Sequence, residues 1–160
     1  LCASFKPYGN TRAYTFRADE KPWQNRDPID DSKLAVAIRD ELEGHNLIVG
    51  WNSKMFDLPF LNARLAKAGE RPVSIKNFHC DLMWYSGGSS MRIGSKKLEN
   101  VQRYFGLADS KTPLNWEDWQ RAALGDRKAM NRVVKHCEQD VKVLAGAYEH
   151  LLPYVKNLHR

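Results

Sequence analysis

The strongest constraint on the fold is a set of apolar residues in the last quarter of the chain. They recur at steps of three or four, which places them on one face of an α-helix. Asp126 can cap the start of such a helix, and Pro153 ends it. The pattern therefore predicts one long amphipathic helix whose apolar face the rest of the chain must cover. Its apolar positions are Met130, Val133, Val134, Cys137, Val141, Leu144, Tyr148 and Leu151.

The first half of the chain mixes strand and helix signals. Residues 1–7 and 11–17 are rich in β-formers and flank a Tyr-Gly-Asn turn, so they predict a hairpin. After a polar loop, Asp30, Asp31 and Ser32 offer a cap for an amphipathic helix that ends near Glu43. The caps are followed by Leu34, Ile38 and Leu42 at helical spacing.

The central part of the chain predicts a strand followed by a helix. Residues 47–49 (Leu-Ile-Val) are too few for a helix and predict a buried strand. The next segment has Leu58, Leu61 and Leu65 at helical spacing, and Gly69 ends that helix. Another strand is expected near 74–78.

Two short helices are expected before the long one. The first covers residues 98–105, and Asn115 can cap the second. Trp116 and Trp119 lie on this second helix and are expected to pack a small helical subdomain.

The order of these elements predicts an α/β fold with one mixed sheet flanked by helices. A length of 160 residues fits one domain, residues 1–160. The chain is 42% hydrophobic and 28% charged, which is close to the globular average and argues against a disordered chain. No apolar run approaches the roughly 20 residues that span a bilayer, so no membrane partner is expected.

Charge and cysteine content narrow the partners. The formal net charge is +6, which suits a nucleic acid as partner, although a basic surface alone has the same balance. Cys2, Cys80 and Cys137 form no CxxC pair, which argues against a zinc site. Their odd number and wide spacing fit a reduced, cytoplasmic setting.

The first candidate motif is Asn52-Ser53-Lys54-Met55-Phe56-Asp57, which directly follows the expected strand and opens the next helix. Sites in α/β folds collect at such strand ends, and the helix dipole favours an ionised Asp57. The simpler interpretation is that Asp57 only decorates the helix start. Phe56 and its neighbours Trp51 and Phe60 can stack on a base, although core packing is the simpler role for each.

The second candidate motif is His136-Cys137-Glu138-Gln139-Asp140 on the long helix. His136 and Asp140 are four residues apart and share a face. Asp140 can hold a metal while His136, which titrates near neutrality, takes a proton. A solvated surface pair is the alternative.

Together the two motifs resemble the DEDD 3′–5′ exonucleases of the ribonuclease H-like superfamily. The shared pattern is a strand, Asn-x-x-x-Phe-Asp and a helix, followed much later by His-x-x-x-Asp on a terminal helix. "His-Cys-Glu-Gln-Asp-Val" before an apolar helix is particularly similar to the predicted exonucleases of this group. The resemblance covers nearly the whole chain and is moderately specific when the motifs are taken jointly.

The resemblance implies a fold, a reaction and a set of residue roles. Two ions, Mg²⁺ or Mn²⁺, bound by four acids would hydrolyse phosphodiesters of single-stranded DNA or RNA from the 3′ end. Asp57 and Asp140 match two of those acids, and His136 occupies the assisting position. Asn52, Lys54 and Phe56 lie in the motif that would contact substrate, and Lys111, a loop cation, would meet phosphate. A role in DNA replication or repair, within a larger polypeptide, would be usual for the family.

Two departures from the family pattern stand out. His136 lies four residues before Asp140, the spacing of the family's tyrosine rather than its histidine, which turns the side chain by about 100°. The chain also has no Asp-x-Glu, the motif that supplies the other two acids from a central strand. We expect that strand upstream of Leu1. Without it, two strand edges are left unpaired and the sheet divides.

Two hypotheses of different classes follow. The first is the metal-dependent exonuclease. The second is a non-catalytic nucleic-acid-binding or scaffold domain that has lost its metal site, because fold alone does not decide function.

Overall fold

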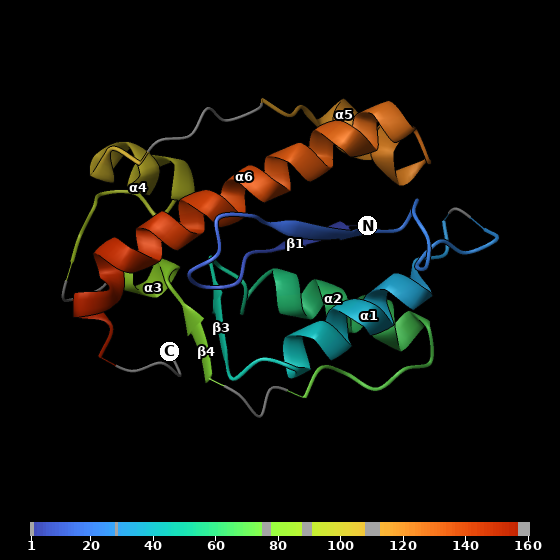
Figure 1. Ribbon diagram of the computed structural model, residues 1–160, viewed down its shortest axis with the longest axis horizontal. Helices are drawn as coiled ribbons and strands as arrows, with labels where there is room; N and C mark the ends of the chain where they lie inside the picture. The colour runs from blue at the N-terminus through green and yellow to red at the C-terminus, as the bar shows by residue number, and fades with distance from the viewer. Residues whose placement is uncertain (1, 28, 75–77, 88–90, 108–112, 157–160) are drawn as a thin grey trace.

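One long helix organises the molecule. The computed structural model describes residues 2–27, 29–74, 78–87, 91–107 and 113–156. Helix α6 (Arg127–Leu151) runs along one side, as Figure 1 shows. Asp126 caps it by accepting the backbone N–H groups of Lys128 at 2.9 Å and Ala129 at 3.1 Å. The predicted long amphipathic helix and its cap are therefore confirmed.

The predicted hairpin lies against α6. Strand β1 (Cys2–Phe5) pairs antiparallel with β2 (Tyr14–Arg17). Thr15 donates its hydroxyl to the Glu138 carboxylate at 3.0 Å, and Arg17 donates to Asn131 at 2.8 Å. Since both acceptors lie on α6, these side chains fix the hairpin along the helix.

Helices α1 (Ser32–Glu43) and α2 (Asp57–Lys67) pack against each other beside the hairpin. Asp31 precedes α1, but it makes no side-chain capping bond. Its carboxylate instead accepts two hydrogen bonds from Arg64, at 2.9 and 2.6 Å, which tie the start of α1 to α2. Asp31 thus occupies the predicted N-cap position, and Asp30 Oδ1 accepts the Ser32 N–H at 2.9 Å, but Asp31 does not cap the helix through its own side chain. The shared core consists of Leu34, Ala35, Ile38, Leu61 and Leu65.

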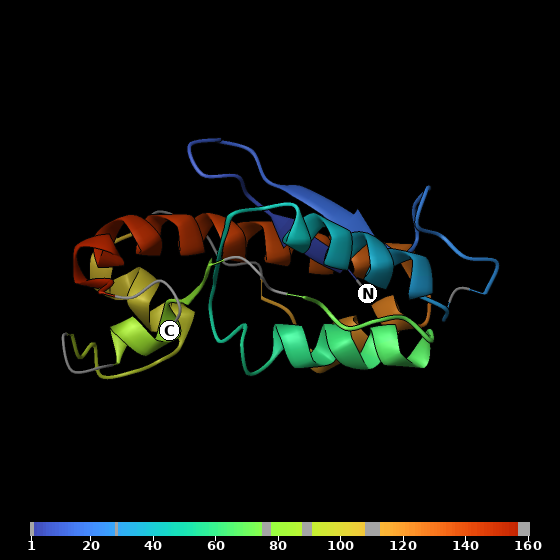
Figure 2. The same ribbon diagram turned by 90° about the horizontal axis from the view of Figure 1, so that it is seen from below.

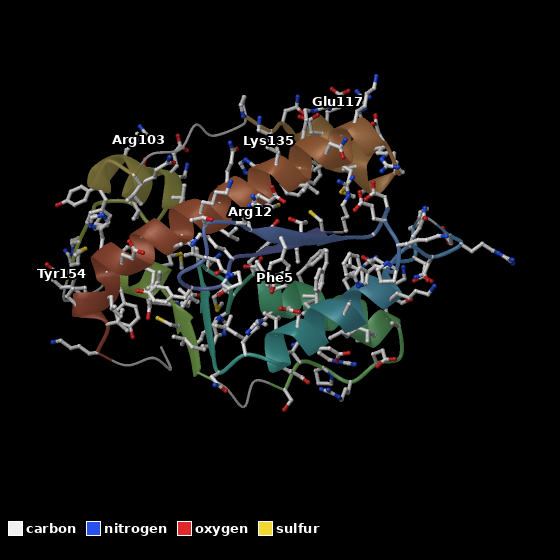
Figure 3. All side chains as sticks on the ribbon, in the orientation of Figure 1. Phe5, Arg12, Arg103, Glu117, Lys135 and Tyr154 are labelled. Carbon is white, nitrogen blue, oxygen red and sulfur yellow. The ribbon has the colours of Figure 1, made fainter. Side chains whose placement is uncertain are left out.

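Aromatic side chains of the hairpin close this core from above. Phe5 and Phe16 pack against it, with ring centroids 5.4 Å apart. In Figure 3, Phe5 lies below β1, on the side of α1 and α2. The hairpin thus packs on α6 and on the α1–α2 pair.

A second strand pair lies farther along α6. Strand β3 (Leu47–Gly50) pairs in parallel with β4 (Phe78–Asp81), and Gly50 stands opposite Asp81. The first of these strands was predicted. The second starts at the end of the predicted 74–78 strand, of which Ser74 is irregular and 75–77 lie outside the described residues.

The other helices of the described residues are α3 (Met83–Ser86), α4 (Leu98–Phe105), α5 (Trp116–Ala123) and the 3₁₀-helix η1 (Leu152–Tyr154). Helix α3 was not predicted. Asn115 caps α5 through a reciprocal capping box, as expected. The packing prediction for its tryptophans is wrong, because Trp116 is 75% exposed and Trp119 is 41% exposed. None of the helices in the described ranges is long and apolar enough to cross a membrane.

The strands form two separate two-stranded sheets within the described part of the chain, and not one continuous mixed sheet. Figure 2, a view from below, shows the β1–β2 hairpin and the segment of β3 as distinct bodies on the α6 scaffold. The residues of β3 before Gly50 are half-buried, so the predicted fully buried strand is wrong. Its position beside only one partner explains this exposure.

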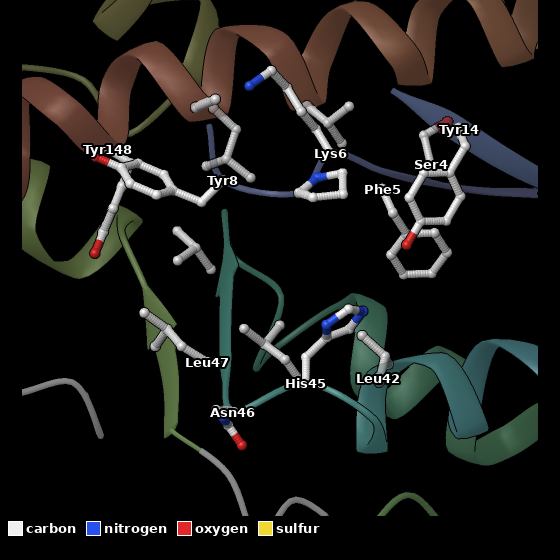
Figure 4. Close-up of a pocket in the computed structure, with 16 residues that line it drawn as sticks. Ser4, Phe5, Lys6, Tyr8, Tyr14, Leu42, His45, Asn46, Leu47 and Tyr148 are labelled. Atoms are coloured by element: carbon white, nitrogen blue, oxygen red, sulfur yellow. The ribbon is translucent and has the colours of Figure 1, made fainter. Parts of the chain in front are cut away.

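A cavity of about 400 Å³ separates the two strand pairs (Figure 4). Consecutive residues of each strand line the cavity. Neighbouring side chains of a strand point to opposite faces of the sheet, so a cavity over one face would contact only every second residue. The cavity therefore lies along the edges of the two strands. Residues 4–8 form one wall and 47–49 another, with α6 contributing Val141, Leu144, Ala145 and Tyr148.

The ion pair between Glu43 and Arg71 predicts a pH-dependent contribution to the stability of the fold. Glu43 accepts two hydrogen bonds from Arg71, both at 2.7 Å, and one from the Ser74 N–H. These bonds lower the pKa of Glu43 from 4.5 to about 2. Because the folded-state pKa is the lower one, the stabilisation is present above pH 4.5 and is lost as the pH falls toward 2.

Glu43→Gln should therefore reduce the melting temperature near pH 7, and the difference from wild type should shrink as the pH falls toward 2. Thermal unfolding followed by circular dichroism from pH 7 to pH 2 measures this. Glu149→Gln, which changes an exposed acid on α6, serves as the control. A pH-independent difference would contradict the assignment.

Candidate metal and nucleic-acid site

Asp57 is the first residue of α2 and lies at the surface. Its pKa is raised, mainly because surrounding protein desolvates the carboxylate and further because Asp81 is negatively charged. A hydrogen bond from its own backbone N–H acts in the opposite direction. The hydrogen bond at the helix start acts in the predicted direction, but desolvation is the larger effect and the net direction of the Asp57 pKa is upward.

The loop before Asp57 is tied to β4. Asn52 adopts a positive φ of 57°, which asparagine tolerates better than most residues. Its N–H donates to Asp81 Oδ1 at 2.8 Å, and the N–H of Lys54 donates to Oδ2 at 3.1 Å. Ser53 Oγ lies 2.8 Å from His79 Nε2, and both residues are buried. Sequence reasoning missed Asp81 and His79, because it placed β4 several residues too early.

Asp140 and His136 lie on one face of α6, as predicted. His136 Nε2 is 3.4 Å from Asp140 Oδ2. The other oxygen, Oδ1 of Asp140, is buried and has no hydrogen-bond partner within the described residues. A buried carboxylate oxygen without a donor is costly, so this atom is a ready acceptor for a cation or a hydrogen-bond donor.

Cys137 links the two candidate motifs. The pKa of its thiol is raised, first by its hydrogen bond with Cys2 and by burial. The negative charges of Asp140 and Asp57 raise it further. Both carboxylates are therefore close enough to Cys137 to act on it, although they come from distant parts of the chain. That Asp57 and Asp140 share one site stays a prediction.

The residues present do not by themselves complete a metal centre. Within the described ranges, no group of three or more His, Cys, Asp or Glu side chains is arranged to hold an ion. Asp57 and the open Oδ1 of Asp140 offer carboxylate oxygens, which Mg²⁺ and Mn²⁺ prefer. They amount to part of a donor set, and the fit to a two-ion centre is incomplete.

An exposed aromatic pair adjoins Asp57. Phe56 is 63% exposed and Phe60 is 47% exposed, so the core-packing interpretation of these two rings is wrong. Their planes are nearly parallel, at 11°, with centroids 6.3 Å apart. Trp51 behaves differently, because it is half-buried and donates its indole N–H to the Lys96 carbonyl. Phe56 and Phe60 thus form an exposed, stacked aromatic pair next to the acid, which a base could meet.

The two lysines predicted to contact phosphate, Lys54 and Lys111, have less support than the aromatic pair. Lys54 is half-buried, and its charge helps to lower the pKa of His79, after the larger effect of burial. Lys111 lies outside the described residues. The roles of Asn52, Lys54, Phe56, Lys111 and His136 therefore remain predictions.

The sequence matches the RNase H superfamily over residues 10–152. The chain belongs to the RNase H superfamily. Members of this superfamily are generally hydrolytic nucleases that use divalent metals, which indicates nuclease-type chemistry on a nucleic acid. No curated protein and no solved structure matches the chain. The match does not select the DEDD exonuclease subtype.

Gly50 provides a test of the local geometry. A Cβ at this position would lie 2.0 Å from Ser53 Oγ and 2.5 Å from Ser53 Cβ, closer than atoms can approach. Gly50→Ala should destabilise the fold by about 1–3 kcal/mol, because the loop must shift. Urea unfolding measures the change.

Ser53→Gly removes both clashing atoms, so the double variant Gly50→Ala/Ser53→Gly should recover stability relative to the sum of the single variants. Gly44→Ala, where the nearest atoms are at 3.4 Å, is the matched control. Simple additivity of the two single changes would refute the proposed contact.

Proposed function

We propose that this domain is a metal-dependent 3′–5′ exonuclease that acts on single-stranded DNA or RNA and releases nucleoside monophosphates. The observation that carries the proposal is the buried Oδ1 of Asp140, which has no hydrogen-bond partner within the described residues and lies on the helix where the exonuclease pattern has an acid. The motifs of Asp57 and Asp140 have the order and the helix positions of the exonuclease pattern. The direction of cleavage comes from the resemblance to that group.

Asp57 and Asp140 would each contribute oxygen ligands to Mg²⁺ or Mn²⁺. When bound, such ions supply an activated water and neutralise charge on the phosphate. His136, held 3.4 Å from Asp140, would orient the attacking water from its position at the tyrosine spacing. The raised pKa of Asp57 fits a carboxylate whose charge is costly until a cation compensates it.

The exposed rings of Phe56 and Phe60 support a single-stranded substrate. Bases are available for stacking on side chains only when they are unpaired. Such stacking contributes roughly 1–3 kcal/mol per base without selecting its identity. We therefore infer that Phe56 stacks against the terminal base, with Lys54, Asn52 and Lys111 near the phosphates.

The cavity between β1 and β3 supports the proposal of a further strand at this place. Both walls are strand edges that pair with no other strand within the described residues. We propose that a strand bearing the two remaining acids occupies this space and completes the metal site. Its lining includes Lys6 and no acidic side chain, which suits an acidic strand better than a basic one.

A domain without catalysis is the second candidate. The incomplete donor set in the described residues favours it. It predicts nucleic-acid binding that weakens steeply with salt and needs no metal. For either function we propose a reducing cytoplasm as the location, which the free cysteines fit. We propose DNA replication or repair as the process.

Degradation of a 5′-labelled single-stranded oligonucleotide with Mn²⁺ tests the leading proposal. We expect a ladder that shortens from the 3′ end and is reduced roughly 100-fold or more by Asp140→Ala, because loss of a metal ligand exceeds the effect of losing its outer partners. Glu149→Ala, which removes an exposed acid from the same helix, should keep the wild-type rate.

Internal cleavage products would contradict the exonuclease direction. Equal metal-dependent rates for wild type and Asp140→Ala would refute the site. Salt-sensitive binding of the oligonucleotide without any cleavage would favour the non-catalytic domain.

A further inference from the structure

The loop of residues 51–56 connects β3 to Asp57, the first residue of α2. It contains turn bonds from the N–H groups of Met55 and Phe56 to the Asn52 carbonyl, at 3.2 and 3.0 Å. Phe56, at the N-cap of α2, makes no side-chain capping bond. The N–H groups of the loop therefore need acceptors from another element.

Asp81, the last residue of β4, provides those acceptors. Its side chain is completely buried. Oδ1 accepts the N–H of Asn52 at 2.8 Å and that of Met83 at 3.3 Å, while Oδ2 accepts the N–H of Lys54 at 3.1 Å. Backbone donors to a carboxylate make charge-assisted bonds, and they are what makes burial of this side chain tolerable.

His79 adds a second attachment from the same strand. His79 and Asp81 are two residues apart on β4, so they point to the same face. Ser53, which His79 contacts, lies between the two loop residues that Asp81 binds. One face of β4 thus holds three successive residues of the loop.

We propose that Asp81 is a positioning residue, which fixes the 51–56 loop and thereby sets the position of Asp57 relative to Asp140. The consequence for catalysis rests on the proposed nuclease function, whereas the restraint of the loop does not. Two of the three N–H groups that Asp81 binds belong to the loop, which distinguishes it from an acid that only stabilises its own strand.

Amide hydrogen exchange tests the restraint directly in the full chain. In Asp81→Ala, exchange at Asn52 and Lys54 should accelerate at least about tenfold, because both amides lose their acceptor. Asp81→Asn should accelerate exchange at one of these two amides and not at the other. Its remaining oxygen can still accept from Asn52, whereas its NH₂ group faces Lys54, so Lys54 alone should be strongly affected.

Asp118→Asn is the matched control. Asp118 is also a buried acid, but its partners Asn115 and Arg132 are remote from the loop in the sequence. It should leave exchange at Asn52 and Lys54 unchanged. Amides of Val133 and Val143, buried on α6, report in the same spectrum whether each variant is folded. Unchanged exchange at Lys54 in folded Asp81→Asn would overturn the proposal.

A double-mutant cycle tests the catalytic consequence. Asp81→Asn should lower kcat about 10- to 100-fold with a smaller change in KM, as for other groups that orient a metal ligand. In the Asp57→Asn background, the same change should have little further effect. Additive losses would show that Asp81 does not act through Asp57. A wild-type chain without nuclease activity would defeat the proposed function, and the exchange data would still decide the role of Asp81 in the loop.

Discussion

The packing of α6 against both strand pairs is the interaction on which the rest of the domain depends. The two sheets do not pair with each other within the described residues. The N-terminal half of α6 packs against β1 and α5. Its C-terminal end packs with Cys80 of β4 and with Leu82 and Tyr85, which follow that strand. The side chains of α6 therefore hold the two strand pairs together, whereas in a continuous sheet backbone hydrogen bonds between neighbouring strands do so. Helix α6 also carries Asp140, so the same packing that joins the halves locates one acid of the site.

The elements with a strong periodic signal could be predicted from the sequence. The period of α6, the capping residues Asp126 and Asn115 and the apolar run of β3 each set a local structure that the fold retains. Local patterns could not show that the side chain of Asp31 binds Arg64 instead of capping α1, because Arg64 lies on another helix.

The candidate site was predictable in part. Asp57 and Asp140 were singled out by their motifs, and the charges of both raise the pKa of Cys137. Their role as metal ligands stays a prediction. The direction of the Asp57 pKa was not foreseen, because desolvation depends on tertiary surroundings. Asp81 was missed for a similar reason. In the sequence it resembles any acid after a short strand, and only the fold shows its carboxylate beneath the 51–56 loop.

The central claim is that Asp57 and Asp140 contribute to one cation site. Addition of Mn²⁺ to the ¹⁵N-labelled chain, followed by NMR, tests it most directly, because the paramagnetic ion broadens nearby amide signals. The claim predicts that amides around Asp57 and Asp140 broaden together at the same low Mn²⁺ concentration, and that Asp140→Ala abolishes the effect at both places. Broadening at only one of the two motifs, or only at acids elsewhere on the surface, would contradict it.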